Sequence, residues 1–353
     1  VIVSMSNNPL FIPVFARLRM ILKNVKLIYY LCLVSFLGVV FGCATNQNSA
    51  LSAPLPQLKT ESNYFTNNLG EPINLRGVSL CSLAWHSPLE QIKRVSDVNT
   101  GWHPNILRLP VQVREWDRIG GDAYIRSRLD PAVKLCRENG VYCIIDWHLI
   151  AAWDDPVSDK RLRDFWRKVA PLYANNSNVL YEICNEPTTP KQRTRENWLR
   201  WRKKAQNWVD FIRTLASETI LLVGSPHWDQ MTSFAANDPI AGKNIGYVTH
   251  VYPNYKPHKW DKLFGDAAAK IPMMITEWGW SSSATSKDSL LYGNTQSFGQ
   301  PLRDYLDARP YIAWTAWSYD PHCGPAMLGN ESDMGDFVKK WLSDIWQRKV
   351  SPL

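Results

Sequence analysis

Short apolar runs alternate with longer amphipathic segments from Pro72 to the end of the chain. The short runs have the length and β-rich composition of buried strands, and the longer segments have the pattern of helices that cover them. Strands that alternate with helices in this way form a parallel sheet with crossover helices. The predicted strands are residues 73–80, 105–111, 141–148, 179–185, 219–224, 245–252, 272–278 and 311–319.

The predicted helices lie between these strands and after the last one. Asn139 and Gly140 are placed to end the second helix, and Asp159 is placed to cap the third. Eight strand–helix units in about 290 residues predict an α/β fold with a single (β/α)8 TIM barrel. A doubly wound open sheet is the alternative, but no glycine-rich phosphate loop follows any of the strands. The predicted helices are residues 88–95, 124–138, 160–173, 195–216, 230–236, 260–270, 301–308 and 332–347.

A targeting segment precedes the barrel. Residues 27–42 carry no charge and follow Lys23 and Lys26, and this stretch is short for a membrane span, so residues 1–43 are expected to be a secretory signal. Residues 40–43 resemble a bacterial lipobox, which implies lipidation at Cys43 and a cell-envelope location, although Phe41 stands where a small residue is usual. A cleaved, secreted protein and a retained anchor are the alternatives. Residues 44–60 are polar and contain proline, as a flexible linker does, so the barrel domain is expected over residues 61–353.

Composition narrows the class of protein. Of 353 residues, 45% are hydrophobic and 20% charged, which excludes a disordered chain and a coiled coil. The formal net charge is +8, but half of it comes from four basic residues before Cys43, so the barrel has no nucleic-acid footprint. The 17 tryptophans exceed what a core usually needs, and flat aromatic rings suit the faces of sugars.

The cysteines of the barrel domain are odd in number and irregular in spacing. This pattern argues against a disulfide framework or a zinc site, and it favours buried free thiols, with a single disulfide pair as the alternative. The residues concerned are Cys81, Cys136, Cys143, Cys184 and Cys323.

Polar residues end most of the predicted strands, and the active site of a barrel lies at that end. Two of them are the carboxylates Glu186 and Glu277, on strands four and seven, which lie across the barrel mouth from each other. Hydrolysis of a glycosidic bond uses such a pair, in which one carboxyl keeps its proton and the other is ionised. Arg108 and Tyr252 are expected to hold Glu277 as an ionised nucleophile, whereas Glu186, closer to His250, is expected to be the proton donor.

Two neighbours of Glu186 receive roles from their positions. Asn185 precedes the proton donor, where its amide can hold a sugar 2-hydroxyl. Glu182 lies on the same face of strand four, deeper in the barrel, and is expected to pair with Arg108 rather than to act as a third catalytic acid.

The segments Asn185-Glu186-Pro187 and Thr276-Glu277-Trp278-Gly279 resemble those of glycoside hydrolase family 5, the cellulase-type retaining β-glycanases of clan A. The resemblance covers roughly residues 61–349 and implies a (β/α)8 barrel, a double-displacement mechanism, and no metal or cofactor. It also implies that His148 and His250 border the cleaved sugar and that Trp317 is its stacking floor. The family's functional set matches, in order, Arg108, His148, Asn185, Glu186, His250, Tyr252, Glu277 and Trp317.

The substrate is less well defined by the sequence. Connections are mostly short, with the longest irregular stretch at residues 281–300, and short loops favour an open cleft and endo action on a polysaccharide or oligosaccharide. Trp85 and His86 follow the first strand and are candidate subsite residues. The form of the Glu277 segment favours β-1,4-glucan, in cellulose-type or mixed-linkage glucans. The alternatives are a family 5 mannanase, xyloglucanase or exo-acting β-glucosidase, and a non-catalytic glycan-binding surface protein; a monomer is expected in each case.

Overall fold

The computed structural model describes residues 54–283, 290–328 and 333–350. The predictions for residues 1–43, including Cys43, and for most of the linker therefore lie outside the described residues. Within the described ranges, no helix has both the length and the apolar character needed to cross a membrane.

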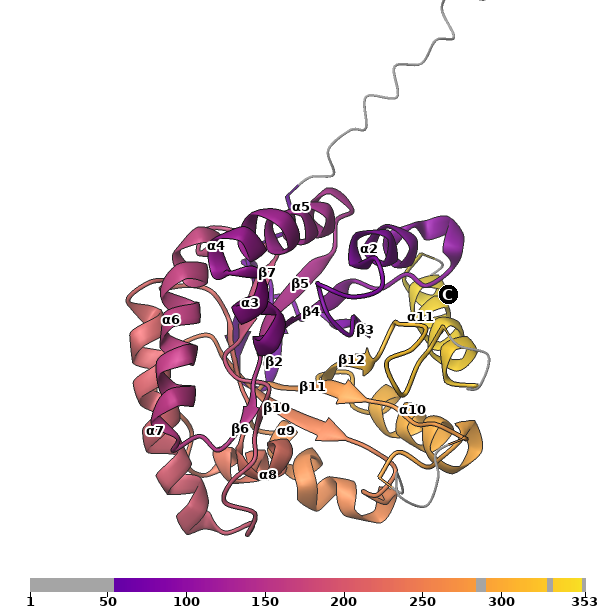
Figure 1. Cartoon of the computed structure of the whole chain (residues 1–353). Coiled ribbons are helices and arrows are strands. Elements are labelled where there is room, and N and C mark those ends of the chain that lie inside the picture. Colours follow the sequence, from indigo (N-terminus) through magenta and orange to yellow (C-terminus); the bar gives the residue numbers. More distant parts are fainter. Residues whose placement is uncertain (1–53, 284–289, 329–332, 351–353) are drawn as a thin grey trace, which may run out of the picture. The chain divides into compact units, whose positions relative to one another are not determined.

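Eight parallel strands of the described chain close into a barrel, as the alternation of strands and helices predicts (Figure 1). Each strand pairs with the strands before and after it in sequence, and β12 pairs with β3 to complete the ring. The predicted (β/α)8 fold is confirmed. The strands are β3 (Arg76–Ser79), β4 (Ile106–Gln112), β5 (Tyr142–His148), β7 (Val179–Glu182), β9 (Leu221–Val223), β10 (Ile245–Val251), β11 (Met273–Trp278) and β12 (Ala313–Trp317).

Helices surround the strands, and their apolar faces pack against the outside of the barrel (Figure 1). Short 3-10 or π turns extend several of them, at Val98–Thr100, Ile125–Leu129, Thr232–Ala236, Pro257–Lys259, Asp261–Gly265 and Thr295–Gly299. The α-helices are α2 (Pro88–Ser96), α3 (Val113–Ile119), α4 (Gly121–Tyr124), α5 (Asp130–Glu138), α6 (Pro156–Tyr173), α7 (Arg195–Arg213), α8 (Pro226–Asp229), α9 (Asp266–Ala268), α10 (Gln300–Asp307) and α11 (Met334–Val350).

Side chains alternate between the inside and the outside of the barrel along each strand. Leu107 and Leu109 face the helices, whereas Ile106 belongs to an apolar layer inside the barrel. That layer also contains Ile144, Leu180, Val248 and Met274. Because positions two apart share a face, the next residues that point inward from the same strands are polar. They are Arg108, Asp146, Glu182, His250 and Thr276, and all are buried.

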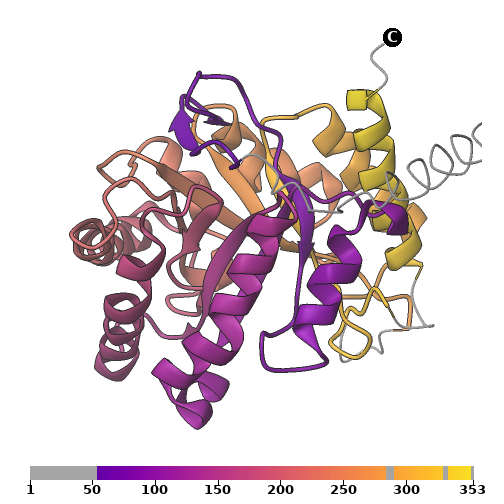
Figure 2. The same ribbon diagram turned by 90° about the horizontal axis from the view of Figure 1, so that it is seen from above.

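A two-stranded hairpin, β1 (Lys59–Glu61) and β2 (Tyr64–Thr66), lies at one end of the barrel, in indigo in Figure 2. Leu58 and Phe65 are buried in the apolar layer at the start of the barrel strands. Gly246 leaves room for this contact, because a Cβ there would lie 3.0 Å from the Phe65 ring. The domain boundary expected at Glu61 is therefore too late, since residues 58–60 already belong to the folded unit.

Of the two predictions for helix ends, one is confirmed and the other is wrong. Asn139 and Gly140 do end α5, and Gly140 adopts the positive φ of 65° that a helix stop uses. Asp155, not Asp159, caps α6, because its side chain accepts from the backbone N–H groups of Val157 and Ser158. The helix predicted over residues 124–138 is divided between α4 and α5 by the π turn Ile125–Leu129.

The expectation of free thiols is wrong for one pair of cysteines. Cys81 and Cys323 form a disulfide across a sequence separation of 242 residues. It joins the segments that follow the first and last barrel strands. The remaining cysteines of the described chain, Cys136, Cys143 and Cys184, are free and buried, as expected.

Candidate active site

Arg108 is the centre of the polar layer inside the barrel and is fully buried. Its Nε donates to Glu182 Oε2 at 2.6 Å, which confirms the predicted pairing, and its Nη1 donates to Glu277 Oε1 at 2.8 Å. Its Nη2 donates to Asn185 Oδ1 at 2.5 Å and lies 3.0 Å from Asp146 Oδ2. Burial lowers the pKa of Arg108, but the surrounding carboxylates raise it well above the usual value. The guanidinium therefore stays charged and holds four side chains in place.

Glu277, at the end of β11, is surrounded by donors. In addition to Arg108, the hydroxyl of Tyr252 donates to Glu277 Oε2 at 2.9 Å, and Nδ1 of His250 lies 3.5 Å from the same oxygen. Burial raises the pKa of Glu277, but the charges of His250, Arg108 and His148 and the hydrogen bond from Tyr252 outweigh it and lower the pKa to about 2. Glu277 is therefore ionised at neutral pH.

Glu186 follows β7 in a short parallel pairing of β8 (Glu186–Pro187) with β6 (Ile150–Ala151). Its backbone N–H donates to the carbonyl of Leu149 at 3.0 Å, which fixes the chain at the barrel mouth. Its Oε1 lies 2.7 Å from Nδ1 of His250, and its side chain is 14% exposed, compared with 7% for Glu277. Carboxylate oxygens of Glu186 and Glu277 lie within 4.8 Å of each other.

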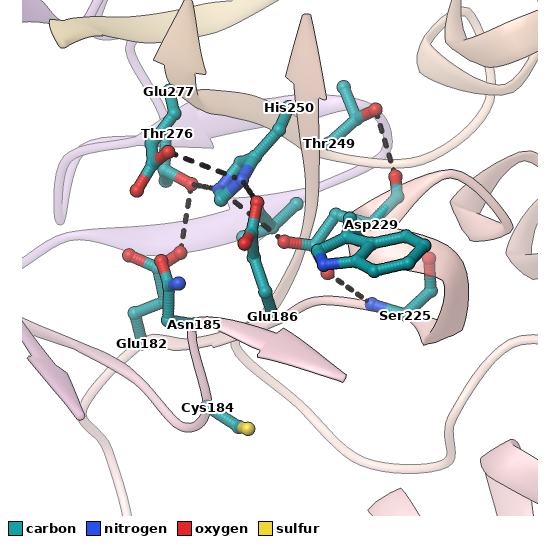
Figure 3. A network of polar contacts seen from close by, with 12 residues as sticks. Glu182, Cys184, Asn185, Glu186, Ser225, Asp229, Thr249, His250, Thr276 and Glu277 are labelled. Atoms are coloured by element: carbon teal, nitrogen blue, oxygen red, sulfur yellow. Dashed lines mark hydrogen bonds and ion pairs between the residues drawn. The ribbon is translucent and has the colours of Figure 1, made fainter. Parts of the chain in front are cut away.

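His250 connects the two sides of this network, as Figure 3 shows. Its Nδ1 faces Glu186, and its Nε2 lies 3.0 Å from Thr276 Oγ1. Thr276 donates its own hydroxyl proton to Glu182 at 2.8 Å, so it accepts a hydrogen bond from His250 Nε2–H. Burial lowers the pKa of His250, but Glu277 and the other neighbouring carboxylates raise it to about 10.

The other predicted residues of the set lie around the same point. The amide oxygen of Asn185 is taken by Arg108, and its Nδ2 is buried with no hydrogen-bond partner. The ring of His148 stacks on Trp317 with 5.4 Å between ring centres and an angle of 3°, and its Nδ1 is fixed by Asp146 Oδ2 at 2.7 Å. The structure thus brings together all eight residues of the predicted set.

Trp85 and His86 have other partners on the same side of the fold as the disulfide. Trp85 is half-buried and, after Arg118, is one of the groups that lower the pKa of Glu115, whereas His86 is exposed. The Nδ1 of His86 lies 2.9 Å from Asp320 Oδ2, and its ring contacts that of His322 edge-on at 5.0 Å. Their role as subsite residues stays a prediction.

A cleft of about 480 Å³ opens beside the two carboxylates. Trp228 and Tyr255 line it together with Glu186, Tyr252 and Glu277. Trp228 is half-buried, and Nζ of Lys191 lies 5.2 Å from its ring centre. Of the other tryptophans near strand ends, Trp153 is half-buried, and Trp147, Trp278 and Trp280 are buried parts of the barrel wall.

Glu186, His250 and Glu277 are also residue types that bind metals. Both ring nitrogens of His250, both carboxylate oxygens of Glu277 and Oε1 of Glu186 already have a hydrogen-bond or ion-pair partner within the site, so we interpret the three residues as a carboxylate pair with its histidine and not as a metal centre. The prediction that the reaction needs no metal or cofactor stays a prediction.

Three residues of the network received no predicted role from the sequence: Asp146, Thr276 and Asp229. Asp146 and Thr276 occur in strand-end segments that the barrel rule singles out. Asp146 lies two residues before His148 on β5, so the two share a face and their contact follows from the strand pattern. The contact of Thr276 with His250 depends on the register of β11 against β10. Asp229 follows β9, so the same rule could have indicated it. The local sequence does not indicate the left-handed turn that positions Asp229.

A closed (β/α)8 barrel with two adjacent carboxylates at its mouth, one of them held ionised, is the framework of a glycoside hydrolase. Residues 66–323 match the family described as Cellulase (glycosyl hydrolase family 5). The chain belongs to this family and is a glycoside hydrolase.

Relatives and solved structures agree with this membership. The chain is 28% identical to the cellulase CelDZ1 of Thermoanaerobacterium sp. over 80% of its own length and 79% of that protein. It is 26% identical to an endoglucanase of Clostridium saccharobutylicum over 82% of its length, but it spans only 63% of that longer protein. The native β-glucanase SdGluc5_26A of Saccharophagus degradans superposes with a TM-score of 0.73 at 26% identity, which covers 83% of this chain and 94% of that chain.

Proposed function

We propose that this protein is a retaining, endo-acting β-glycanase that hydrolyses β-1,4-glucosidic bonds in cellulose-type or mixed-linkage glucans. The observation that carries the proposal is the pair of carboxylates within 4.8 Å of each other. Retaining enzymes hold their carboxyl groups about 5 Å apart, whereas inverting enzymes leave about 6.5–9.5 Å for a water molecule. The names of the relatives, cellulase and endoglucanase, support a glucan as the substrate.

The surroundings of Glu186 and Glu277 suit the two carboxyl groups to different roles in a double displacement. Glu277, ionised and held by Arg108 and Tyr252, attacks the anomeric carbon and forms a glycosyl ester. As the glycosidic bond breaks, Glu186 gives its proton to the leaving oxygen. A water molecule then attacks the anomeric carbon, Glu186 takes the proton of that water, and the bond to Glu277 breaks. Glu186 is suited to the exchange because its side chain is the more exposed of the two.

Two neighbours are placed to hold the sugar. The free Nδ2 of Asn185 is the donor that a sugar 2-hydroxyl needs, because the amide oxygen is already taken by Arg108. Trp317, held in orientation by its stack with His148 and by a hydrogen bond from its Nε1 to Gly324 O, offers an aromatic floor. Trp228 also lines the cleft and offers a second aromatic ring for a longer glucan chain, which supports endo action.

The function is tested by incubating the purified chain with carboxymethyl cellulose, barley mixed-linkage glucan, xyloglucan and glucomannan. A viscosity loss that is fast relative to reducing-end release on the first two substrates is expected. Glu277→Gln should abolish it, and Glu218→Gln, the same change at an exposed ion pair with Lys243, should retain it. Activity confined to glucomannan would make the protein a mannanase, and activity that survives Glu277→Gln would contradict the assignment of the nucleophile.

We also propose, from the sequence of residues 23–43 alone, that the protein is a lipoprotein of the cell envelope anchored at Cys43. Incorporation of labelled palmitate into the full chain, but not into Cys43→Ser, is the expected result. Equal labelling of both would refute the anchor. A monomeric state stays a prediction.

A further inference from the structure

Asp229 is a buried carboxylate for which the double displacement has no role. It ends α8, immediately after barrel strand β9, and its exposed fraction is 0%. Its Oδ1 accepts from the backbone N–H of Ser225 at 2.6 Å. Its Oδ2 has no hydrogen bond of good geometry and lies 3.3 Å from Nε2 of His250 (Figure 3). A carboxylate buried in this way is costly unless a positive charge faces it.

The backbone that carries Asp229 is strained. His227, Trp228 and Asp229 have φ values of 60°, 53° and 60°, so three successive residues with side chains adopt the left-handed region. Residues that carry a Cβ disfavour this conformation for steric reasons. The turn is held by a hydrogen bond from Thr249 Oγ1 to the Asp229 carbonyl at 3.0 Å. Gly224 is required beside it, since a Cβ there would lie 2.1 Å from Asp229 Oδ1. The strained turn therefore places the Asp229 carboxylate behind the ring of His250.

His250 can exist in two states that differ in the hydrogen bond to Glu186. Thr276 accepts from Nε2–H in both states, because its own proton goes to Glu182. When the ring is neutral, its Nδ1 lone pair accepts a hydrogen bond from the protonated Glu186. The Glu186 proton is then held in that hydrogen bond. A charged ring presents Nδ1–H to Glu186 Oε1, which leaves the catalytic proton on Oε2, the oxygen free to face a leaving group.

We propose that Asp229 is a positioning residue that keeps His250 charged, so that Nδ1–H donates to Glu186 and the catalytic proton stays on Glu186 Oε2. The inference rests on the proposed function, in which Glu186 is the proton donor. Asp229 touches neither the substrate nor Glu186, and it acts only through the imidazole ring.

The charges around His250 agree with this role. It is faced by Glu186 from β8, Glu277 from β11 and Asp229 from α8, and through Thr276 by Glu182 of β7. Burial raises the pKa of Asp229, so this carboxyl becomes neutral at the acid end of the pH range. There, His250 is charged without its help. As the pH rises, the ionised Asp229 keeps the imidazolium from losing its proton.

The test is Asp229→Asn, because asparagine has nearly the same shape and tolerates the left-handed conformation. Titration of the His250 ring nitrogens by NMR in the free protein, assigned by their loss in His250→Gln, should show a pKa lower than in the wild type by about one unit or more. The basic limb of kcat/KM should move to lower pH by the same amount, while the two profiles coincide at acid pH. An unchanged His250 titration would overturn the proposal.

Two further variants distinguish the effect of the Asp229 charge from an effect of packing around His250. Thr232→Val removes a buried hydrogen bond to the Val248 carbonyl, on the same strand as His250, and changes no charge. Its pH profile should keep the wild-type shape even if its stability falls, and a matching shift would refute a role for charge. Asp229→Gly, which relieves the strain at this residue, is the second variant should Asp229→Asn not fold. The NMR titration needs no turnover, so failure of the proposed function would appear separately, as activity in Glu277→Gln.

Discussion

Removal of the Cys81–Cys323 disulfide is expected to loosen the substrate side of the barrel before the rest of the fold. The bridge holds the loop after β12, where the Ser318 hydroxyl donates to the Cys323 carbonyl at 2.7 Å and Trp317 Nε1 donates to Gly324 O at 3.2 Å. Asp320 accepts from the backbone N–H groups of two residues of the same loop. Trp317, which we propose as the aromatic floor of the site, is therefore held by a loop that the disulfide ties to the segment after the first barrel strand.

The magnitude follows from the length of chain that the bridge closes. A cross-link over 242 residues removes loop entropy from the unfolded state that corresponds to about 5 kcal/mol at 25 °C, and measured values are more often 2–4 kcal/mol. A loss of this size lowers the melting temperature of a domain this large by about 5–10 °C. It is a large share of a total stability of about 5–15 kcal/mol.

The assay compares calorimetric melting of the wild type and of Cys81→Ala/Cys323→Ala, each with and without a phosphine reductant. The wild type should lose about 5–10 °C on reduction. The double variant should melt at that lower temperature and should not respond to the reductant. Mass spectrometry after alkylation establishes whether the bridge has opened. A wild type whose bridge is open and whose melting temperature is unchanged would refute the reasoning.

Two further predictions concern the carboxylates. Tyr252→Phe removes a hydrogen bond to the ionised Glu277, and since such bonds contribute roughly 1.5–3 kcal/mol, kcat/KM should fall about 10- to 100-fold. Loss of this donor raises the pKa of Glu277 from about 2, so the acid limb of the profile should move to higher pH, and an unmoved limb would contradict the role of Tyr252. Glu186→Ala should impair hydrolysis of glucans far more than that of aryl cellobiosides with good leaving groups, which need no protonation. Equal losses on both substrates would rule out Glu186 as the acid.

The barrel and most of its site could be predicted because they depend on short-range patterns. Buried parallel strands appear as apolar runs between amphipathic helices, and residues two apart on a strand share a face. That rule places both Glu182 and Arg108 inside the barrel, where a buried carboxylate and a buried guanidinium are expected to pair, and the structure has them 2.6 Å apart. Strand-end position was sufficient to collect the eight residues that converge around Glu186 and Glu277.

The features that escaped prediction depend on contacts between distant segments. Cys81 and Cys323 are 242 residues apart, so no local spacing indicates that they meet. The left-handed turn that ends at Asp229 is imposed by its fit against Gly224 and β10, although no residue in it is glycine. The early start of the folded unit at Leu58 depends on the apolar cluster inside the barrel in which Leu58 is buried, and a polar, proline-containing segment does not reveal this contact.

The most direct test of the central claim, a covalent intermediate on Glu277, is a trapping experiment with an activated 2-deoxy-2-fluoro-β-cellobioside. Retaining enzymes accumulate a glycosyl ester with such substrates because the fluorine slows the second displacement. Intact-mass analysis should show one added fluorocellobiosyl group, and peptide mapping should place it on Glu277. An adduct on Glu186 or Glu182, or turnover of glucan by a protein that never becomes labelled, would contradict the account.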